Sequence, residues 1–301
     1  MTATTDLTRL AAPKAPPFAI PTWIRPIPVP AGVHRLAGGL ASFDVVDIVQ
    51  RDEAGYSASR HSLDEVLATA DDRNRAAAAI DRLTSPRADW ADLPLDRPTI
   101  MGILNVTPDS FSDGGRHNAP ARAIAAARTM IEAGAGIVDI GGESTRPGAE
   151  PVTRNQELAR VLPPIAGLRD SGALLSIDTR HAEVMTRAAA AGAGIINDVN
   201  GLRGEGALNA AAASGAAVAI MHMQGTPETM QQDPHYGFAP VEIYEFLEDR
   251  ITRAEAAGIS RAQIAIDPGF GFGKAPAHNL TLIAWTAMFH GLGVPILVGA
   301  S

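Results

Sequence analysis

The sequence predicts an α/β protein whose main part is a (β/α)8 barrel, with strand eight absent from the given chain and with an N-terminal extension. From residue 99 onwards, short apolar runs recur, and each ends in a polar or glycine-rich cluster that a helical stretch follows. The runs do not alternate between apolar and polar residues, which is typical of strands buried on both faces of a parallel sheet. The sequence contains no Gly-x-Gly-x-x-Gly fingerprint, so the barrel is favoured over a dinucleotide-binding sheet.

Seven runs are predicted to be the strands of this barrel: residues 100–106, 137–141, 174–177, 195–199, 217–221, 264–266 and 295–298. Alanine-rich stretches between them, such as residues 121–133 and 182–191, predict helices. Gly134 and Gly192 stand where helix C-caps are expected. A barrel of seven strands would have two open edges, which proteins avoid. We therefore expect the given chain, which stops at Ser301, to lack the C-terminal part of the domain.

Residues 1–95 are predicted to form an N-terminal extension or a small appended domain of unknown function, and residues 96–301 the barrel domain. Seven prolines between Pro13 and Pro30 predict a loop-like start, because proline removes a backbone donor and disfavours helix in the preceding residue. One strand is expected at residues 43–49.

A helix is predicted after this strand. Ser62 and Glu65 have the spacing of a capping box, in which the serine side chain accepts from the Glu65 amide and Glu65 reaches back. The apolar positions of the predicted helix are Val66, Leu67, Ala70, Ile80 and Leu83. We find no chemical motif in this part of the chain.

The composition excludes several classes of function. The chain has 301 residues, 46% of them apolar, which is enough for a large core. Its net charge of −8 disfavours nucleic-acid binding, and the absence of cysteine excludes disulfides and thiolate chemistry. No run reaches about 20 strongly apolar residues and no signal peptide is recognisable, so the sequence predicts a cytoplasmic protein that makes no membrane contact.

Polar residues follow six of the predicted strands. In such barrels the active site forms at the C-terminal ends of the strands, so these residues are expected to meet at one mouth. Some have a purely structural alternative: Asp198 as a helix cap, His222 as a satisfied structural histidine, and Asp139 as an internal hydrogen-bond partner. The polar strand ends are Asn105 and residues 107–115, 142–148, 178–179, 197–198, 221–225 and 267–274.

Asp178, Asn197 and Asp267 are predicted to point into this mouth together. Two carboxylates and an amide are acceptors suited to a flat heterocycle with N–H donors along one edge, such as a 2-amino-4-oxopteridine. A site built from such acceptors rejects an analogue that lacks the donors. The same carboxylates also suit metal ligation or acid–base catalysis, and the residues alone leave these alternatives open.

Three blocks of this sequence resemble the dihydropteroate synthase family. Residues 103–115 (ILNVTPDSFSDGG) resemble its first signature, residues 139–148 (DIGGESTRPG) its second, and residues 267–274 (DPGFGFGK) its strand-six motif. The resemblance covers residues 98–301 and leaves the N-terminal part outside. Further short segments fall in the order that the family has: residues 176–179, 197–198 and 221–225.

The resemblance implies a TIM-barrel transferase of folate biosynthesis. Its reaction joins (7,8-dihydropterin-6-yl)methyl diphosphate to 4-aminobenzoate and gives dihydropteroate and diphosphate. It implies Mg²⁺ as the cofactor with Asn105 at the Mg²⁺–diphosphate site, loops carrying Asp109 and Arg146 as catalytic residues, a homodimer, and sulfonamide binding in the aminobenzoate pocket. The substrate-binding residues that it implies are Phe111, Thr145, Pro147, Asp178, Asn197, Met221, Asp267, Phe272, Lys274 and Ser301.

The sequence departs from the family pattern at its end. In the family, strand seven ends in Ser-Arg-Lys and strand eight supplies an Arg-x-His pair for the diphosphate, whereas this chain ends at Ser301. We therefore expect the chain as given to be inactive or nearly so. Two alternatives remain: a corrinoid-type pterin-binding methyltransferase domain, and a non-catalytic barrel that serves as a binding or regulatory partner. The first signature and residues 144–147 argue against the methyltransferase.

Overall fold

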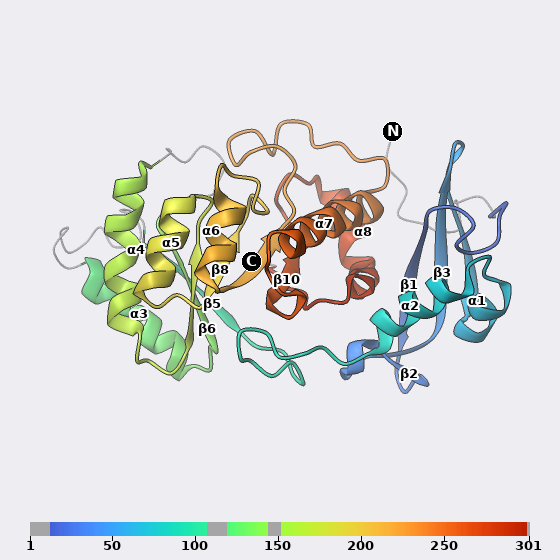
Figure 1. The fold of residues 1–301 in the computed structure, drawn as a ribbon, viewed down its shortest axis with the longest axis horizontal. Coiled ribbons are helices and arrows are strands. Elements are labelled where there is room, and N and C mark those ends of the chain that lie inside the picture. Colours follow the sequence, from blue (N-terminus) through green and yellow to red (C-terminus); the bar gives the residue numbers. More distant parts are fainter. Residues whose placement is uncertain (1–12, 107–118, 144–151, 300–301) are drawn as a thin grey trace.

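Two assemblies of secondary structure make up the protein (Figure 1). The computed structural model describes residues 13–106, 119–143 and 152–299. A four-stranded antiparallel sheet with two helices comes first, and we call residues 13–84 the N-terminal module. A six-stranded parallel sheet surrounded by helices follows. Figure 1 shows the module at one end of the molecule, helices α3 and α4 at the other, and α7 and α8 between them.

The sheet of the N-terminal module contains more strands than the sequence predicted. Strands β1 (Thr22–Val29), β2 (His34–Arg35) and β4 (Gly55–Ser62) all pair with β3 (Ser42–Asp52). The expected loop over residues 1–32 is therefore wrong at β1, although this strand contains Pro26 and Pro28. Among the described residues its only strand partner is β3, and the register shifts between the two prolines. An edge strand with such an irregularity tolerates proline, because fewer of its N–H groups are needed for pairing.

Two helices stand where one was predicted. The capping box is confirmed, because Ser62 Oγ accepts from Glu65 N at 3.2 Å and Glu65 Oε2 accepts from Ser62 N at 2.8 Å. Helix α1 (Leu63–Thr69) then ends, and α2 (Arg73–Thr84) begins after Asp72, whose side chain accepts from Arg75 N. A second N-cap thus starts a new helix within the predicted one.

The parallel sheet confirms the predicted order of strands. Its sequence-ordered neighbours are β5 (Met101–Asn105), β6 (Ile137–Gly141), β7 (Leu174–Asp178), β8 (Ile195–Asp198), β9 (Ala217–Met221) and β10 (Ile264–Asp267). The helices that alternate with them are α3 (Ala119–Glu132), α4 (Arg154–Leu168), α5 (Ala182–Ala191), α6 (Ala207–Ser214), α7 (Ala239–Ala256) and α8 (Pro276–Ala284), with the 3-10 turns η4 (Arg261–Gln263) and η5 (Thr286–Leu292). This is the architecture of the (β/α)8 barrel. None of the described helices has the length and apolar character needed to cross a membrane.

The seventh predicted strand lies beside β10 but forms only a short parallel bridge. Ile266 pairs with Ile296, and Leu297 N donates to Ile266 O at 2.7 Å. At the opposite side of the sheet, the outer edge of β5 has no strand partner among the described residues. Ile100 and Ile103 near this edge are 65% and 54% exposed. The predicted C-caps are confirmed in the backbone of Gly134 and Gly192, whose φ angles are positive.

The barrel sheet has a helix-covered outer face and an enclosed inner face. Alternate strand residues such as Val138, Ile177 and Ile220 pack outwards in the large core with the helices. The other set faces inwards, where Trp90, Ile137, Ile195, Ala217 and Ala265 fill the amino end of the barrel. This alternation follows from the pleat of a strand, and it leaves the inward residues at the carboxyl ends for the site.

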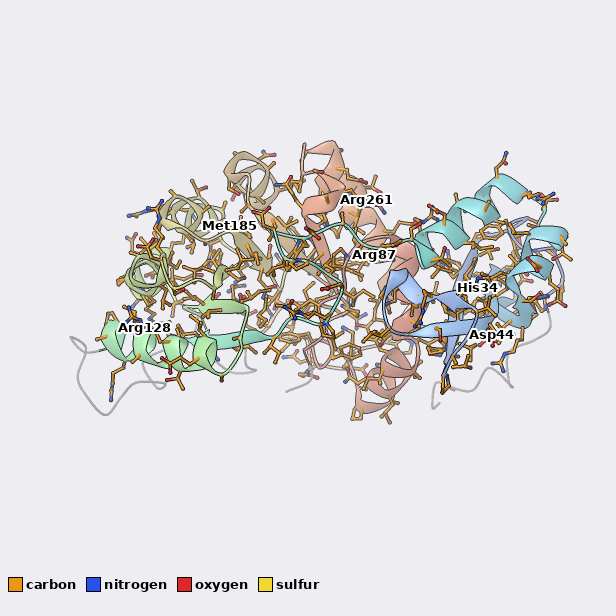
Figure 2. All side chains as sticks on the ribbon, turned by 90° about the horizontal axis from the view of Figure 1, so that it is seen from below. His34, Asp44, Arg87, Arg128, Met185 and Arg261 are labelled. Carbon is orange, nitrogen blue, oxygen red and sulfur yellow. The ribbon has the colours of Figure 1, made fainter. Side chains whose placement is uncertain are left out.

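The N-terminal module packs against the last described unit of the barrel. Trp23 and Val49 belong to the same core as the barrel helices. Arg51 donates to both carboxylate oxygens of Glu245 at 2.7 and 2.8 Å, and the Arg25 guanidinium lies 4.4 Å from the ring centroid of Trp285. Figure 2 shows Arg87 between the module and the distant helix α3; its guanidinium donates to His290 O at 2.8 Å.

Candidate active site

One row of side chains crosses the inner face at the carboxyl ends of the strands. Residues that pair directly across neighbouring parallel strands face the same side of a sheet. The observed register pairs Gly141 with both Asn105 and Asp178, and Asp178 with Asn197. It then pairs Asn197 with Ala219, and Met221, two residues further along β9, with Asp267. The predicted convergence is therefore found in what we call the inner row: Asn105, Asp178, Asn197, Met221 and Asp267.

Asn105 and Asp178 approach one another over Gly141. A Cβ atom placed on Gly141 would lie 3.3 Å from Asp178 Oδ2 and 3.6 Å from Asn105 Oδ1. A side chain at this position would therefore occupy the space that these two oxygens share. Burial in the barrel raises the pKa of Asp178 well above its usual value, and repulsion from the neighbouring Asp139 raises it further. Asp178 is thus a carboxyl group for which a ligand N–H donor is a favourable partner.

Asp267 is held by the backbone of the loop that follows it. Its Oδ1 accepts from Gly269 N at 2.6 Å, and burial raises its pKa to about 6. Gly269 has a φ of +69°, and a Cβ atom there would lie 2.0 Å from His222 O. Only glycine fits this approach of two backbones. The glycine-rich segment of the third motif is therefore a tightly packed turn here and not a flexible lid.

The buried Lys274 side chain holds the same loop together through hydrogen bonds to its carbonyl groups. Its Nζ donates to Gly269 O at 2.7 Å and to Phe272 O at 2.9 Å, and it lies 3.1 Å from His222 Nδ1. Burial lowers the Lys274 pKa to about 7, although Asp267 opposes this. Burial, followed by the charge of Lys274, also lowers the pKa of His222, so its neutral ring is an acceptor for the ammonium. Lys274 is near Asp267 as expected, but its donors are occupied by the protein, and His222 has the structural role.

An apolar cluster lies next to the inner row. Phe272 packs against a group formed by Val199, Met221, Met223 and Met230. Such polarisable side chains suit contact with the face of a flat ring. The sequence predicted Met221 and Phe272 as substrate contacts, and the structure brings these two together.

Several charged residues near the strand ends have structural partners that the sequence did not reveal. Asp198 accepts from Asn200 N and Leu202 N at 2.7 and 2.9 Å. These bonds hold a turn and not a helix start, because α6 begins at Ala207 with Gly206 as its N-cap, so the helix-cap prediction is wrong. Arg180 donates to both carboxylate oxygens of Glu143 at 3.0 Å. These contacts join segments far apart in sequence, and only the assembled barrel brings them together.

The contacts of Asp139 were the hardest to predict from the sequence. It is buried on the inner face of β6, and its Oδ2 accepts from Asn197 Nδ2 at 2.9 Å. Burial raises the Asp139 pKa, although the hydrogen bond from Asn197 opposes this. The sequence indicated this residue only as a charged side chain within an apolar strand. Its partner Asn197 lies two strands away and could not be predicted.

Six predicted site residues lie outside the described residues: Asp109, Phe111, Thr145, Arg146, Pro147 and Ser301. The described part of the site therefore consists of acceptors, an apolar cluster and one engaged lysine. The described residues contain no group of three His, Cys, Asp or Glu side chains suited to hold a metal ion. The arrangement suits a planar ligand whose edge carries N–H donors.

Comparison with known proteins gives a consistent family. Residues 101–301 match the family described as pterin binding enzyme. Dihydropteroate synthase of Escherichia coli K12 is 48% identical over 215 residues, which are 71% of this chain and 76% of that protein. The crystal structure of the Xanthomonas albilineans dihydropteroate synthase with 4-aminobenzoic acid is similar with a TM-score of 0.67 at 51% identity, and it covers 72% of this chain and 79% of that one.

A third relative reaches further into the chain. The probable bifunctional folylpolyglutamate synthase/dihydropteroate synthase of Haloferax volcanii is 41% identical over 274 residues, or 88% of this chain and 32% of that protein. Because residues 101–301 are only about two thirds of the chain, this alignment includes part of the first 100 residues. The relatives favour the synthase over the methyltransferase alternative. The chain belongs to the dihydropteroate synthase family of pterin-binding enzymes, transferases that join a pterin methyl diphosphate to 4-aminobenzoate in folate biosynthesis.

Proposed function

We propose that the inner row holds the pterin half of the substrate in the family's reaction. The observation that carries the proposal is the row of acceptors that Asp178, Asn197 and Asp267 form at the ends of β7, β8 and β10, with Met221 of β9 between the last two. These side chains accept from N–H groups on the heterocycle edge, and Met221 and Phe272 contact its face. Lys274 fixes the loop that presents Asp267 and adds positive charge near the ring.

In this reaction the bond between the pterin methylene carbon and the diphosphate oxygen breaks, and the electron pair leaves with the diphosphate. The amino nitrogen of 4-aminobenzoate then forms the new bond to the methylene and loses a proton. The protein's part is to orient the two substrates and to exclude water that would capture the methylene carbon. By family resemblance, Asp109 and Arg146 act at the reacting centre, and Phe111, Thr145, Pro147 and Ser301 contact substrate.

The direct test is pterin binding followed by product formation. We expect the chain to quench the fluorescence of added pterin saturably, and we expect an Asp178→Asn and Asp267→Asn double variant to lose this signal. Dihydropteroate formation from the pterin diphosphate and 4-aminobenzoate, followed by chromatography, measures turnover separately. A parent chain that does not bind pterin at all would contradict the proposed function.

Asn105 suits a magnesium ion that arrives with the diphosphate. Mg²⁺ keeps several waters and uses only one or two protein ligands beside substrate phosphates. Asn105 supplies an exposed amide oxygen at the end of β5, beside Asp178 Oδ2. A magnesium ion held there would supply positive charge to the leaving diphosphate.

We expect Mg²⁺ to bind weakly alone and at least about tenfold more tightly when the pterin diphosphate is present, since substrate oxygens complete its shell. Isothermal titration of Mg²⁺ measures both affinities. Asn105→Ala should weaken only the substrate-dependent binding, by about tenfold. Asn209→Ala, on the exposed face of α6, is the matched control and should change neither. Equal Mg²⁺ affinity with and without substrate would contradict this assignment.

We further propose that the N-terminal module braces the barrel and takes no direct part in chemistry. Its support is the contact of Trp23, Arg25 and Arg51 with the segment that contains α7, α8 and η5. We place the start of the barrel domain at residue 96, as the sequence suggests, so that residues 85–95 connect the module to the barrel. A cytoplasmic location is the expectation from the sequence. A homodimer is expected from the family, and sedimentation equilibrium is its test.

A further inference from the structure

We propose that Asp139 is a positioning residue that fixes the orientation of the Asn197 side-chain amide. In that orientation the amide carbonyl faces the ligand and selects heterocycles that carry an N–H donor at this point. The inference rests on the proposed function, because the ligand in question is the pterin ring. It adds a determinant of specificity that lies one layer below the inner row.

The geometry places Asp139 beneath Asn197 and out of the ligand's reach. Asp139 pairs with Ser176 of β7, whereas Asn197 pairs with Asp178, two residues closer to the mouth. The hydrogen bond from Asn197 Nδ2 to Asp139 Oδ2, at 2.9 Å, therefore crosses the inner face of β7. Asp139 is 5% exposed. A ligand at the strand ends meets Asn197 first, and Asp139 acts only through it.

The carboxylate decides which end of the amide faces the ligand. An asparagine amide has a donor end and an acceptor end of nearly equal shape, so its orientation follows from its hydrogen bonds. Asp139 Oδ2 accepts from Asn197 Nδ2, so it holds the donor end of the amide and turns Oδ1 away. Among the described residues, Asp139 is the only hydrogen-bond partner of the Asn197 side chain. A reversed amide would place two buried acceptors against one another, which costs about 1–3 kcal/mol.

The fixed amide distinguishes two ligands of similar shape. Pterin carries a 2-amino group, which donates, whereas lumazine carries a 2-oxo group, which accepts. With Oδ1 fixed towards the ligand, pterin gains a hydrogen bond and lumazine meets a second acceptor. A site built in this way discriminates strongly, because its buried acceptor is left unpaired by the wrong ligand.

Asp139 also disfavours folding. A residue with a purely structural role would stabilise the fold, so this property distinguishes a positioning role from a structural one. It is buried, and that burial raises its pKa although the side chains of Ser176 and Asn197 oppose this. A buried carboxylate without a cationic partner disfavours the folded state. An asparagine at this position has the same shape without the charge. Asp139→Asn is therefore expected to fold at least as well as the parent chain.

The experiment compares the dissociation constants of pterin and lumazine for the full chain and for Asp139→Asn, by fluorescence titration at pH 8. The amide that this substitution introduces both donates and accepts, so it no longer dictates the Asn197 orientation. We expect the ratio of lumazine to pterin dissociation constants to fall by about tenfold in the variant, with an unchanged or higher melting temperature. Asp198→Asn is the matched control, since Asp198 is equally buried but bonds only to loop N–H groups. Its ratio should equal that of the parent.

Each outcome has a distinct meaning. An unchanged ratio in Asp139→Asn, or an equal loss of affinity for both ligands, overturns the positioning role. A parent chain that binds pterin without discriminating against lumazine also overturns it. A parent chain that binds neither ligand overturns the proposed function itself, so the two failures are distinguishable.

Discussion

Asp267→Asn is expected to make the protein more stable at pH 8 while weakening pterin binding by about 10- to 100-fold. The loss follows from removing a charged acceptor for ligand N–H groups, a contact of about 1.5–3 kcal/mol. The gain in stability follows from the burial of the Asp267 carboxyl group. The pKa of Asp267 is raised from 3.8 to about 6, so the folded protein holds its proton more tightly than the unfolded chain does.

The sign of the pH dependence follows from this raised pKa. Below about pH 4 the group is protonated in both states and changes nothing. As the pH rises through 6, ionisation destabilises the folded state by up to about 3 kcal/mol, since one pKa unit corresponds to about 1.4 kcal/mol. Asparagine does not ionise, and its Oδ1 retains the bond from Gly269 N. The variant's advantage in free energy of unfolding should therefore appear between pH 4 and pH 6 and persist at higher pH.

Urea unfolding at pH 4 and pH 8, with pterin titrations at pH 5 and pH 8, checks both parts. The parent should lose pterin affinity below pH 6 as Asp267 takes up its proton, and the variant should not show this loss. Asp198→Asn is the control for binding, since its pKa is also raised to about 6 but it lies outside the inner row. Unchanged pterin affinity in Asp267→Asn would remove Asp267 from the site.

Trp23→Ala is expected to destabilise the whole chain by about 3–5 kcal/mol, the usual effect of truncating a buried tryptophan. Trp23 is 7% exposed and belongs to the core that the barrel helices share. The Arg51 guanidinium lies 5.3 Å from its ring centroid, so the substitution also loosens the bidentate contact to Glu245. The melting temperature should fall by roughly 6–12 °C.

Hydrogen exchange identifies the helices that Trp23→Ala destabilises. If the module braces the barrel, amides of α7 and η5 should exchange faster in Trp23→Ala, while those of α3 and α4 at the far end should change less. Val33→Ala is the control, because Val33 lies in the same module and is 82% exposed; it should change stability by less than about 0.5 kcal/mol. A Trp23→Ala chain as stable as Val33→Ala would show that the module is not a brace.

Much of the barrel was predictable because its signals are local. Buried parallel strands are continuous apolar runs, so residues 137–141 and 217–221 were predicted with their observed bounds. The inner row was predictable because active-site residues of barrels follow the strands. Asp178 and Asp267 met this condition directly in the sequence.

What was missed depends on contacts between distant segments. Strands β1 and β3 of the N-terminal module contribute residues to two cores, one with α1 and α2 and one with the barrel, and the barrel surface lies some 200 residues later in the chain. The prolines therefore led to the prediction of a loop where the structure has the edge strand β1. The bonds of Lys274 to Gly269 O and Phe272 O could not be predicted, because only the folded turn brings these carbonyls together. Asp139 and its bond to Asn197 needed the register of three strands.

The contact between the N-terminal module and the barrel joins segments that the ribosome makes early and late. The module's outward side chains Trp23 and Val49 are translated long before α7 and η5, against which they finally pack. Contacts of such large sequence separation form late, and surfaces awaiting them are open to misassembly. The nascent chain therefore carries an exposed apolar patch until about residue 290 has emerged, and a slow final docking step is the kinetic signature to expect in refolding.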